Sequence, residues 1–259
     1  MKIFQIDAFT TERFAGNPAA VMVLEAFPAD SVLRAAAAEN NLPETAFLVR
    51  DGEDYRLRWF TPTVEVPLCG HATLASAAAV MERLDPGREA VRFQTASGPL
   101  TVSRSGERYV MDFPARVATP VQAPAGLSAA LGVEPLETVW DGFNYLVRLA
   151  TPEQVRGLKP DLAAVARWDC AGVIVTAADG PVFDFVSRYF APAMGIPEDP
   201  VTGGAHCALA PYWAERLNKT VFRAFQASQR GGEILCRVKS DRVELEGACV
   251  FYLEGEAQL

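Results

Sequence analysis

Three short segments of this sequence place ionisable side chains beside glycine or proline, a combination suited to proton transfer. The segments are residues 40–47 (NNLPETAF), 68–72 (LCGHA) and 198–206 (EDPVTGGAH). The chain has no GxGxxG, GxxxxGK[ST], GxSxG, CxxC or HExxH pattern, so nucleotide binding, serine-hydrolase chemistry and structural zinc have no motif in their favour. We therefore expect the chemistry to depend on the ionisable groups at the starts of glycine-led helices.

Glu44 stands at the head of an apolar run, directly after a proline turn. A carboxyl group among apolar neighbours loses solvation, which raises its pKa. A carboxyl group with a pKa nearer neutrality can act as a general acid and base. The alternative is a surface glutamate at the start of a strand, and the residues alone leave these two interpretations level.

Gly70 and His71 stand where a buried helix is expected to begin. The unpaired amides and the dipole at such a helix end favour an anion, and glycine lets a ligand approach the backbone closely. The same position lowers the pKa of His71, so we expect a neutral imidazole that relays a proton or hydrogen-bonds a substrate. A histidine packed in the core is the alternative, and it fits His206 better than His71.

Gly203 and Gly204 would expose two consecutive amides at the start of a second helix, which suits a carboxylate or an oxyanion. Asp199 and Thr202 precede them, and either residue could instead cap this helix. We expect both roles to coexist. Asn17, in a Gly-Asn-Pro turn, is a further candidate donor to a ligand, although such a turn also forms on its own account.

An internal repeat indicates the elements that position these residues. Residues 54–67 (DYRLRWFTPTVEVP) match residues 184–197 (DFVSRYFAPAMGIP) at a constant offset of 130, and residues 70–84 match residues 203–217 at an offset of 133. The three additional residues of the second copy are placed within residues 198–206. A repeat of about half the chain predicts two homologous domains instead of a solenoid of short units.

Each copy reads as a strand, a proline-bounded turn and a glycine-started helix. The helix expected at 72–83 is apolar nearly all round, which is typical of a buried helix and implies a sheet curved around it. Pro211 is expected to kink or break the second helix. A surface helix at 29–40 is expected to begin with Asp30 or Ser31 as its cap.

These patterns predict an α+β protein of two pseudo-symmetric domains, each a curved, mostly antiparallel sheet or barrel around a central buried helix. The domains are expected at residues 1–115 and 116–259, with segment 115–128 as the crossover and with the last strand of the chain able to pack back on the first domain. Strands are expected near residues 2–9, 19–24, 45–50, 54–60, 89–94, 98–104, 108–113, 136–141, 143–149, 171–176, 182–189, 219–225, 233–238, 241–247 and 249–253.

Composition excludes several classes of protein. The 259 residues are 50% hydrophobic and 22% charged, with a net charge of −8 and no basic run. We therefore expect neither a nucleic-acid partner nor a membrane partner. The five cysteines are odd in number and scattered, and no secretory signal pattern is present. Both observations favour a cytoplasmic protein with reduced thiols.

Five segments together resemble the PhzF family of phenazine-biosynthesis-like proteins over essentially the whole chain. They are IDAFTTERFAGNPAAV, NLPETAFLV, FTPTVEVPLCGHATLASA, FQTASGPL and FAPAMGIPEDPVTGGAH. The family is similar in fold to the cofactor-independent diaminopimelate epimerases. The resemblance implies an isomerase in which a glutamate moves a proton on a dihydro-hydroxyanthranilate ring without a metal or an organic cofactor, and it implies a homodimer.

The resemblance also assigns roles to individual residues. The family's glutamate matches Glu44, its histidine matches His71 and its aspartate matches Asp199. Its glycine-led substrate cradle matches Gly203 and the next residue, but Gly204 stands where the family usually has a serine. A hydroxyl that could bond the substrate or relay a proton is therefore missing. Cys69 is a second departure from the phenazine enzyme.

We expect an isomerase that moves a proton on carbon of a small carboxylate-bearing substrate in a cleft between the two domains. Glu44 would be the general acid and base, while His71 and Asp199 hold or polarise the substrate. The expected substrate-binding residues are Asn17, Gly70, Thr202, Gly203 and Gly204. Two alternatives stay open: a two-thiol amino-acid racemase or epimerase that uses Cys69 and Cys207, and a non-catalytic small-molecule binder.

Overall fold

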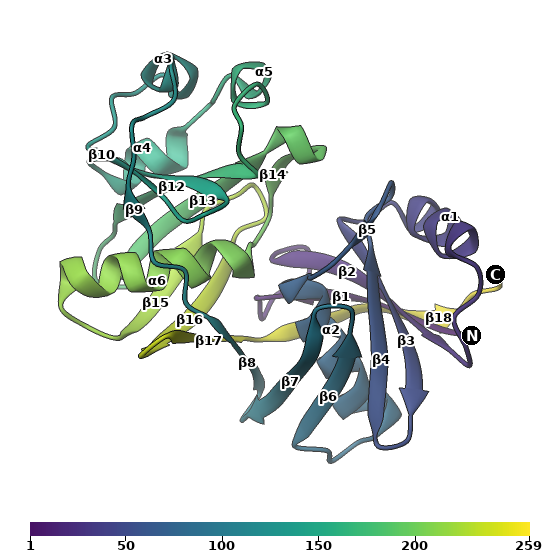
Figure 1. Ribbon diagram of the computed structural model, residues 1–259. Coiled ribbons are helices and arrows are strands. Elements are labelled where there is room, and N and C mark those ends of the chain that lie inside the picture. The colour runs from purple at the N-terminus through teal and green to yellow at the C-terminus, as the bar shows by residue number, and fades with distance from the viewer. The chain divides into compact units, whose positions relative to one another are not determined.

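The computed structural model describes residues 1–259, which form two compact units. Unit 1 comprises Met1–Asp112 and Glu246–Leu259, and unit 2 comprises Phe113–Leu245. Both units consist of strands and a smaller number of helices (Figure 1). The chain passes from one unit to the other after Asp112 and again after Leu245, so segment 115–128 lies within unit 2.

Unit 1 is built from strands β1–β8 and β18, with two helices. The strands are β1 (Lys2–Ala8), β2 (Asn17–Leu24), β3 (Glu44–Asp51), β4 (Asp54–Phe60), β5 (Glu65–Val66), β6 (Ala90–Thr95), β7 (Gly98–Ser105), β8 (Arg108–Pro114) and β18 (Cys249–Glu256). The helices are α1 (Asp30–Asn40) and α2 (Gly70–Ala79), and α2 continues into a π-helical turn, η1 (Val80–Leu84).

Unit 2 is built from strands β9–β17 and four helices. The strands are β9 (Thr119–Pro120), β10 (Glu137–Trp140), β11 (Asn144–Arg148), β12 (Gly172–Ala178), β13 (Phe185–Ala191), β14 (Ile196–Asp199), β15 (Val221–Gln226), β16 (Gly232–Lys239) and β17 (Arg242–Gly247). The helices are α3 (Leu127–Leu131), α4 (Pro152–Gly157), α5 (Leu162–Val165) and α6 (Gly203–Leu217), with a 3₁₀ turn, η2 (Pro192–Met194).

Strand pairing follows the same series in the two units. In unit 1, β1 pairs with β2, β2 runs parallel to β3, β3 runs antiparallel to β4, and β4 pairs antiparallel with β5 and parallel with β6. In unit 2, the strands β10, β11, β12, β13, β14 and β15 repeat every one of these relationships. The last strand of the chain, β18, pairs antiparallel with β1.

Helix α2 is the buried core helix of unit 1, as its composition predicts. Every residue from His71 to Ala79 is buried, and the helix contacts β1, β2, β3, β7 and β18. Five of its ten residues are alanine. Because alanine favours the helix and occupies little space, strands can pack closely around all its faces. The predicted α+β architecture with a central buried helix is confirmed.

The register of β14 corrects the predicted position of the three-residue insertion. Trp59 pairs with Val66, whereas the equivalent Tyr189 pairs with Asp199. The offset is therefore already 133 at β14, and the additional residues lie before this strand, near the 3₁₀ turn η2. The expectation that residues 198–206 contain the insertion is wrong. Residues 65–71 (EVPLCGH) correspond in order to residues 198–204 (EDPVTGG).

The same ion pair supports this correspondence in both units. Arg58 binds both carboxylate oxygens of Glu65 at 2.7 Å, and Arg188 binds those of Glu198 at 2.7 and 2.9 Å. Each pair joins the long strand, β4 or β13, to the short strand before the glycine-started helix. Bidentate arginine–carboxylate pairing has a defined geometry, so it orients the segment that leads into that helix.

Pro211 lies inside α6 without breaking it, because another segment replaces the hydrogen bond that proline cannot make. A residue at this position would donate its amide to the carbonyl of Cys207, four residues earlier. That carbonyl instead accepts the backbone amide of Arg116 at 2.9 Å. The helix therefore runs from Gly203 to Leu217, and the expected break is absent.

The start of α1 also differs from the expectation. Ala29 occupies the N-cap position, no side chain caps the helix, and Asp30 is its first helical residue. Asp30 instead accepts a hydrogen bond from Arg58 at 2.9 Å. The predicted cap is wrong because this acidic side chain pairs with an arginine of the neighbouring strand.

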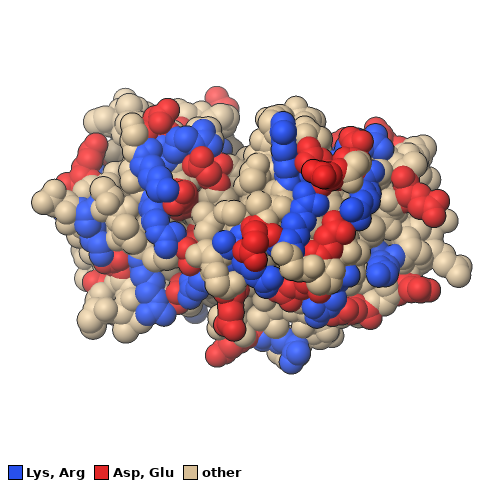
Figure 2. Space-filling view, turned by 90° about the horizontal axis from the view of Figure 1, so that it is seen from below, with Lys and Arg blue, Asp and Glu red and all other residues tan.

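No helix of the protein combines the length and the apolar character that a membrane crossing requires. Basic and acidic side chains are interspersed over the face shown in Figure 2.

Unit 1 has buried apolar side chains between α1 and its strands, including Leu33, Phe47 and Phe60. Unit 2 has its own cluster on β11, β12 and β13, including Val147, Val173 and Phe190.

Gly16 precedes Asn17 in a position that only glycine can occupy. Its φ is +64°, and an added Cβ would lie 2.2 Å from the carbonyl oxygen of Ala8. Gly87 is the matched control, because its φ is +90° but an added Cβ would meet nothing within 4 Å. A positive φ costs a non-glycine residue about 1–2 kcal/mol, and overpacking adds about 1–3 kcal/mol.

We expect Gly87→Ala to lower the free energy of unfolding by about 1 kcal/mol, because it introduces backbone strain alone. Gly16→Ala should lower it by about 2 kcal/mol more, since it adds the steric clash. Urea denaturation of both variants, followed by circular dichroism, measures the difference. Equal losses would contradict the close approach of residue 16 to Ala8.

Candidate functional site

The residues predicted to do chemistry form two clusters, one in each unit. In unit 1, the Glu44 cluster consists of Glu44, Cys69 and His71. Glu44 is the first residue of β3, and its side chain is 11% exposed. His71 lies in the first turn of α2, and its side chain is 6% exposed. Glu44 Oε2 and His71 Nε2 are 3.2 Å apart, so the structure brings together two of the predicted catalytic residues.

Cys69 is the third member of this cluster. It is the N-cap residue of α2, and its Sγ lies 3.5 Å from His71 Nδ1. The thiol does not cap the helix, whereas the Cys69 carbonyl accepts hydrogen bonds from the amide and the hydroxyl of Thr73 at 3.1 and 2.6 Å. The thiol, the imidazole and the carboxylate therefore lie close together at the amino end of a buried helix.

His71 is neutral near neutral pH. Burial lowers its pKa from 6.5 to about 3, and a hydrogen bond to the backbone of Pro18 opposes this shift without cancelling it. Proline has no amide hydrogen, so the Pro18 carbonyl accepts and the imidazole donates. The sequence predicted a neutral imidazole from the helix end, but burial is the dominant cause.

The two ring nitrogens of His71 have different surroundings. Nδ1 lies 3.5 Å from Cys69 Sγ, while Nε2 is buried and makes no hydrogen bond. Glu44 Oε2 lies 3.2 Å from Nε2, but the two atoms are not aligned for a hydrogen bond.

The turn of residues 16–18 connects Asn17 to this cluster. The Asn17 side chain is buried, and its neighbour Pro18 supplies the carbonyl that orients His71. Strand β2 holds the turn in place, because Asn17 pairs with Ala8 on one side and Ala19 pairs with Glu44 on the other. The predicted contact of Asn17 with a substrate stays a prediction.

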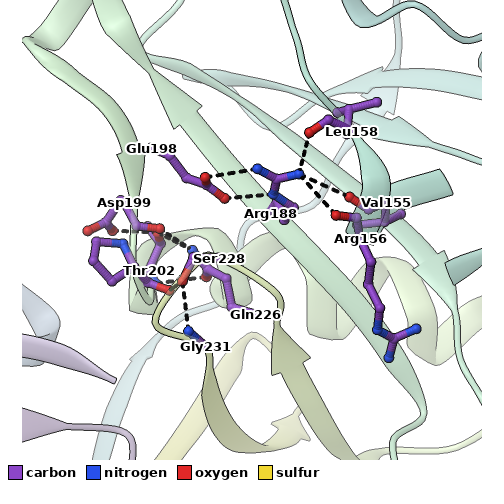
Figure 3. Close-up of polar contacts among 11 residues, drawn as sticks. Val155, Arg156, Leu158, Arg188, Glu198, Asp199, Thr202, Gln226, Ser228 and Gly231 are labelled. Atoms are coloured by element: carbon purple, nitrogen blue, oxygen red, sulfur yellow. Dashed lines mark hydrogen bonds and ion pairs between the residues drawn. The ribbon is translucent and has the colours of Figure 1, made fainter. Parts of the chain in front are cut away.

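In unit 2, the Asp199 cluster consists of Asp199, Thr202 and Gln226 (Figure 3). The Thr202 hydroxyl donates to the Asp199 carboxylate. The Thr202 amide donates to Gln226 Oε1 at 2.8 Å, and Gln226 Nε2 donates to the Asp199 carbonyl at 2.8 Å. Thr202 is the N-cap residue of α6, but its side chain makes no capping hydrogen bond. Simple helix capping therefore does not account for either Asp199 or Thr202.

Gly203 and Gly204 form the first turn of α6, directly after this cluster. Gly203 is buried and Gly204 is half-buried. A Cβ added to Gly204 would lie 3.9 Å from Nη1 of Arg116, so a cationic group lies beside the exposed amides. The Arg116 guanidinium stacks 4.8 Å from the ring centre of Phe143 and lies 3.9 Å from Asp141 Oδ2.

The sequence analysis missed Gln226 and Arg116. Gln226 ends β15, at a distance of 24 residues from Thr202 along the chain, and no motif marks it. Arg116 lies in the proline-rich segment interpreted as a crossover, and only the close approach of its backbone to α6 reveals its position. Both residues depend on tertiary contacts that residue spacing does not record.

Arg188 and Glu198 are close to the Asp199 cluster in the chain but serve the fold. Figure 3 shows the Arg188 guanidinium between the Glu198 carboxylate and a set of backbone carbonyls. These carbonyls belong to Val155, Arg156 and Leu158, at 3.3, 3.5 and 2.6 Å. Through these hydrogen bonds, Arg188 joins β14 to α4.

Each predicted site residue lies in one of these two places. Glu44, Gly70 and His71 meet in unit 1, where the Asn17 turn adjoins them, while Asp199, Thr202, Gly203 and Gly204 meet in unit 2. One nitrogen, one sulfur and one carboxylate oxygen of the Glu44 cluster lie within 4.8 Å of one another, so these three residues are the candidates for holding a metal ion.

The position of Cys207 counts against the two-thiol alternative. Its thiol donates to the carbonyl of Gly203 at 3.5 Å within α6. The residue equivalent to Cys69 is Thr202, because both are the N-cap residues of their glycine-started helices. A second thiol is therefore absent from the position that the repeat provides.

Comparison with known proteins identifies the relatives of this chain. Residues 6–255 match the family model described as phenazine biosynthesis-like protein. An uncharacterized isomerase of Pseudomonas aeruginosa is 50% identical over 259 residues, which cover 100% of this chain and 99% of the relative. A crystal structure of a PhzF family protein from Enterococcus faecalis has a TM-score of 0.96 and 44% identity and covers 100% of this chain and 99% of its own.

More distant structures share the fold alone. A probable proline racemase from Agrobacterium radiobacter superimposes with a TM-score of 0.63 at 12% identity, over 100% of this chain and 93% of its own. The similarity shows that this chain shares its fold with that racemase.

Because two histidines are buried, we predict that the protein loses stability as the pH falls. Burial lowers the pKa of His71 to about 3 and that of His206 to about 4, against 6.5 for an ordinary histidine. Between pH 6.5 and these values the unfolded chain binds protons that the folded protein does not, so the unfolding free energy decreases as the pH falls. From pH 7 to pH 5 each histidine should contribute a loss of about 2 kcal/mol.

Urea denaturation at pH 7 and pH 5 measures this loss, and the His71→Gln/His206→Gln variant is the comparison. Carboxylates contribute equally to both proteins, so the variant should show the smaller decrease. An unchanged decrease in the variant, or imidazole NMR signals that titrate near pH 6.5 in the folded protein, would contradict the buried neutral state.

Proposed function

This chain belongs to the phenazine biosynthesis-like family of isomerases, and on that basis we propose that it moves a proton on carbon of a small carboxylate-bearing substrate. No cofactor enters the proposed reaction. The observation that carries the proposal is the buried contact of 3.2 Å between Glu44 Oε2 and His71 Nε2, at the amino end of a buried helix.

Glu44 is proposed as the group that removes and returns the proton. One carboxylate oxygen takes the proton from a substrate carbon, the C–H electron pair remains on the substrate as a delocalised carbanion, and the O–H then delivers the proton to another carbon or to the other face. Because the side chain is 11% exposed, few water molecules compete for this proton.

His71 is proposed to position Glu44 and to hydrogen-bond the substrate. Its pKa of about 3 keeps it neutral, so it does not supply a formal positive charge at neutral pH. The Pro18 hydrogen bond helps to orient the ring, which lies 3.2 Å from the Glu44 carboxylate. The role matches the family histidine in the Gly-His turn.

The amides at the starts of α2 and α6 are proposed to bind negative charge. Gly70 starts α2, and Gly203 and Gly204 start α6. Preorganised amides stabilise a carboxylate or a carbanion enolate without reorganising during the reaction. Arg116 beside Gly204 supplies a positive charge to the same end of α6, so a carboxylate is the favoured substrate group here.

Asp199 and Thr202 are proposed as a second set of polar groups for the substrate. The hydroxyl of Thr202 donates to Asp199, and Gln226 holds both backbones. The expectation that both clusters act on one substrate in a cleft between the domains stays a prediction, as do the homodimer and the cytoplasmic location. Two single variants test this: loss of turnover in Asp199→Asn as well as in Glu44→Gln would support a single site.

Deuterium exchange in D₂O tests the proposed reaction on many candidate substrates in parallel. A panel of cyclic, 2-amino and conjugated carboxylic acids is incubated with the protein, and mass spectrometry detects C–H positions that gain deuterium. An isomerase of this type exchanges such a proton, whereas a non-catalytic binder leaves every mass unchanged.

We expect Glu44→Gln to lower the exchange rate about 100- to 10,000-fold, because it removes the acid–base group and keeps its shape. Glu39→Gln is the control, since Glu39 is an exposed residue of α1. Circular dichroism confirms that both variants fold. Exchange that survives within a few-fold in Glu44→Gln would overturn the assignment of Glu44.

Gly204→Ser tests the departure from the family serine. The position has space, because an added Cβ meets nothing closer than the Arg116 guanidinium at 3.9 Å. The variant should fold with equal or slightly greater stability, since serine is a better helix residue than glycine by about 0.5 kcal/mol.

For the substrate found by exchange, we expect Gly204→Ser to raise KM about 2- to 10-fold with little change in kcat. The added hydroxyl alters one hydrogen bond at the carboxylate but leaves Glu44 unchanged. Gly157→Ser in α4 is the control, because it is an equally open helical glycine away from the cluster. An unchanged KM would place the substrate away from the start of α6.

A further inference from the structure

We propose that the Glu44 cluster binds one thiophilic divalent cation of the Zn²⁺ type, and that the bound ion blocks the proton transfer. The ion is an inhibitor here and not a resident cofactor. The binding stands on the geometry of Glu44, Cys69 and His71 alone. The inhibition rests on the proposed function, because it requires Glu44 to be the acid–base group.

The donor set is of the kind that zinc prefers. Imidazole nitrogen, thiolate sulfur and carboxylate oxygen all ligate Zn²⁺, and thiolate disfavours Mg²⁺ and Ca²⁺. One such atom from each residue lies within 4.8 Å of the others. In a tetrahedral site with bonds of about 2.0–2.3 Å the ligand atoms are roughly 3.3–3.8 Å apart, so an inward shift of about 1 Å completes the site.

The orientation of His71 is a second, independent indication. Its Nε2 is buried, has no hydrogen-bond partner and lies 3.2 Å from a carboxylate oxygen. The ring also forms a hydrogen bond with the backbone of Pro18. Metal-ligating histidines characteristically donate their second ring nitrogen to a carbonyl or carboxylate, which fixes the tautomer that leaves a lone pair for the metal.

Charge also fits a buried divalent cation. The thiolate of Cys69 and the carboxylate of Glu44 together carry two negative charges, which balance the two positive charges of Zn²⁺. A neutral site avoids the desolvation penalty of an unpaired buried charge.

Three protein ligands leave one coordination position open, which water or a carboxylate can fill. On binding, the Zn–S bond forms, the S–H bond of Cys69 breaks, and its proton passes to solvent without any electron transfer. Glu44 then donates its electron pair to the metal, so it no longer accepts a proton from carbon.

The experiment measures Zn²⁺ and Cd²⁺ binding to the purified full-length protein. Competition with a chromophoric chelator gives the Zn²⁺ affinity, ultraviolet thiolate-to-cadmium absorption reports sulfur ligation, and a pH indicator reports proton release. We expect one equivalent of Zn²⁺ and at least one proton released. Cys69→Ser should weaken binding at least about tenfold and abolish the cadmium band.

Cys170→Ser is the matched control, because Cys170 is a half-buried thiol of unit 2, outside the cluster. It should bind Zn²⁺ with the affinity of the unmodified protein. His71→Gln is a second variant, and circular dichroism confirms the fold of all three. An absent stoichiometric Zn²⁺ site, a cadmium band that persists in Cys69→Ser, or a band lost in Cys170→Ser would each overturn the proposal.

Deuterium exchange separates this inference from the proposed function. Zn²⁺ should reduce exchange in proportion to site occupancy, and a chelator should restore it. Stoichiometric binding without any effect on exchange would sustain the metal site and refute the role of Glu44. Exchange that depends on Glu44 in a protein without a Zn²⁺ site would sustain the proposed function and refute the metal site.

Discussion

The contact between the Glu44 carboxylate and the His71 imidazole is the constraint on which unit 1 depends. Glu44 Oε2 and His71 Nε2 are both buried and lie 3.2 Å apart, outside the alignment of a hydrogen bond. The surrounding structure holds them in this position through several independent elements. Pro18 fixes the ring, β2 fixes the start of β3, and the strands around α2 fix the helix that carries His71.

The repeat gives both units the same scaffold but different side chains at the same positions. The arginine–glutamate pair and the starting glycine recur, as Glu65 and Gly70 in unit 1 and as Glu198 and Gly203 in unit 2. Three other equivalents differ in chemistry: Val66 and Asp199, Cys69 and Thr202, His71 and Gly204. A threonine hydroxyl does not ionise near neutral pH as a thiol can, so the two helix ends are chemically unequal. This inequality favours a one-sided proton shift over an exchange between two matched thiols.

Features governed by local sequence were predictable, and features set by tertiary contacts were not. Alternating and apolar runs located every expected strand to within three residues of its observed ends, because side-chain periodicity is a property of the strand itself. The strands β5, β9 and β14 are too short to show a period. Residues 67 and 197 are both proline, and this coincidence led the insertion to be placed too late in the chain. Arg116 completes the hydrogen bonds of α6 near Pro211 through a contact with Cys207. These two residues are 91 positions apart in the chain, so no local pattern encodes the contact.

The Glu44 cluster is also where unit 1 departs most from the rules of stable folding. A glycine at φ +64° packs against a carbonyl, an asparagine side chain is fully buried, and a buried imidazole has one nitrogen without a hydrogen-bond partner. The buried asparagine and the imidazole nitrogen without a hydrogen-bond partner each lower stability relative to an apolar replacement of similar shape, and the glycine holds a backbone conformation that other residues adopt only with strain. An alanine-rich helix and its strands could pack without any of them, as the residues of α2 beyond its first turn do. Their concentration within the turn of residues 16–18 and the first turn of α2 is therefore better explained by chemistry than by packing.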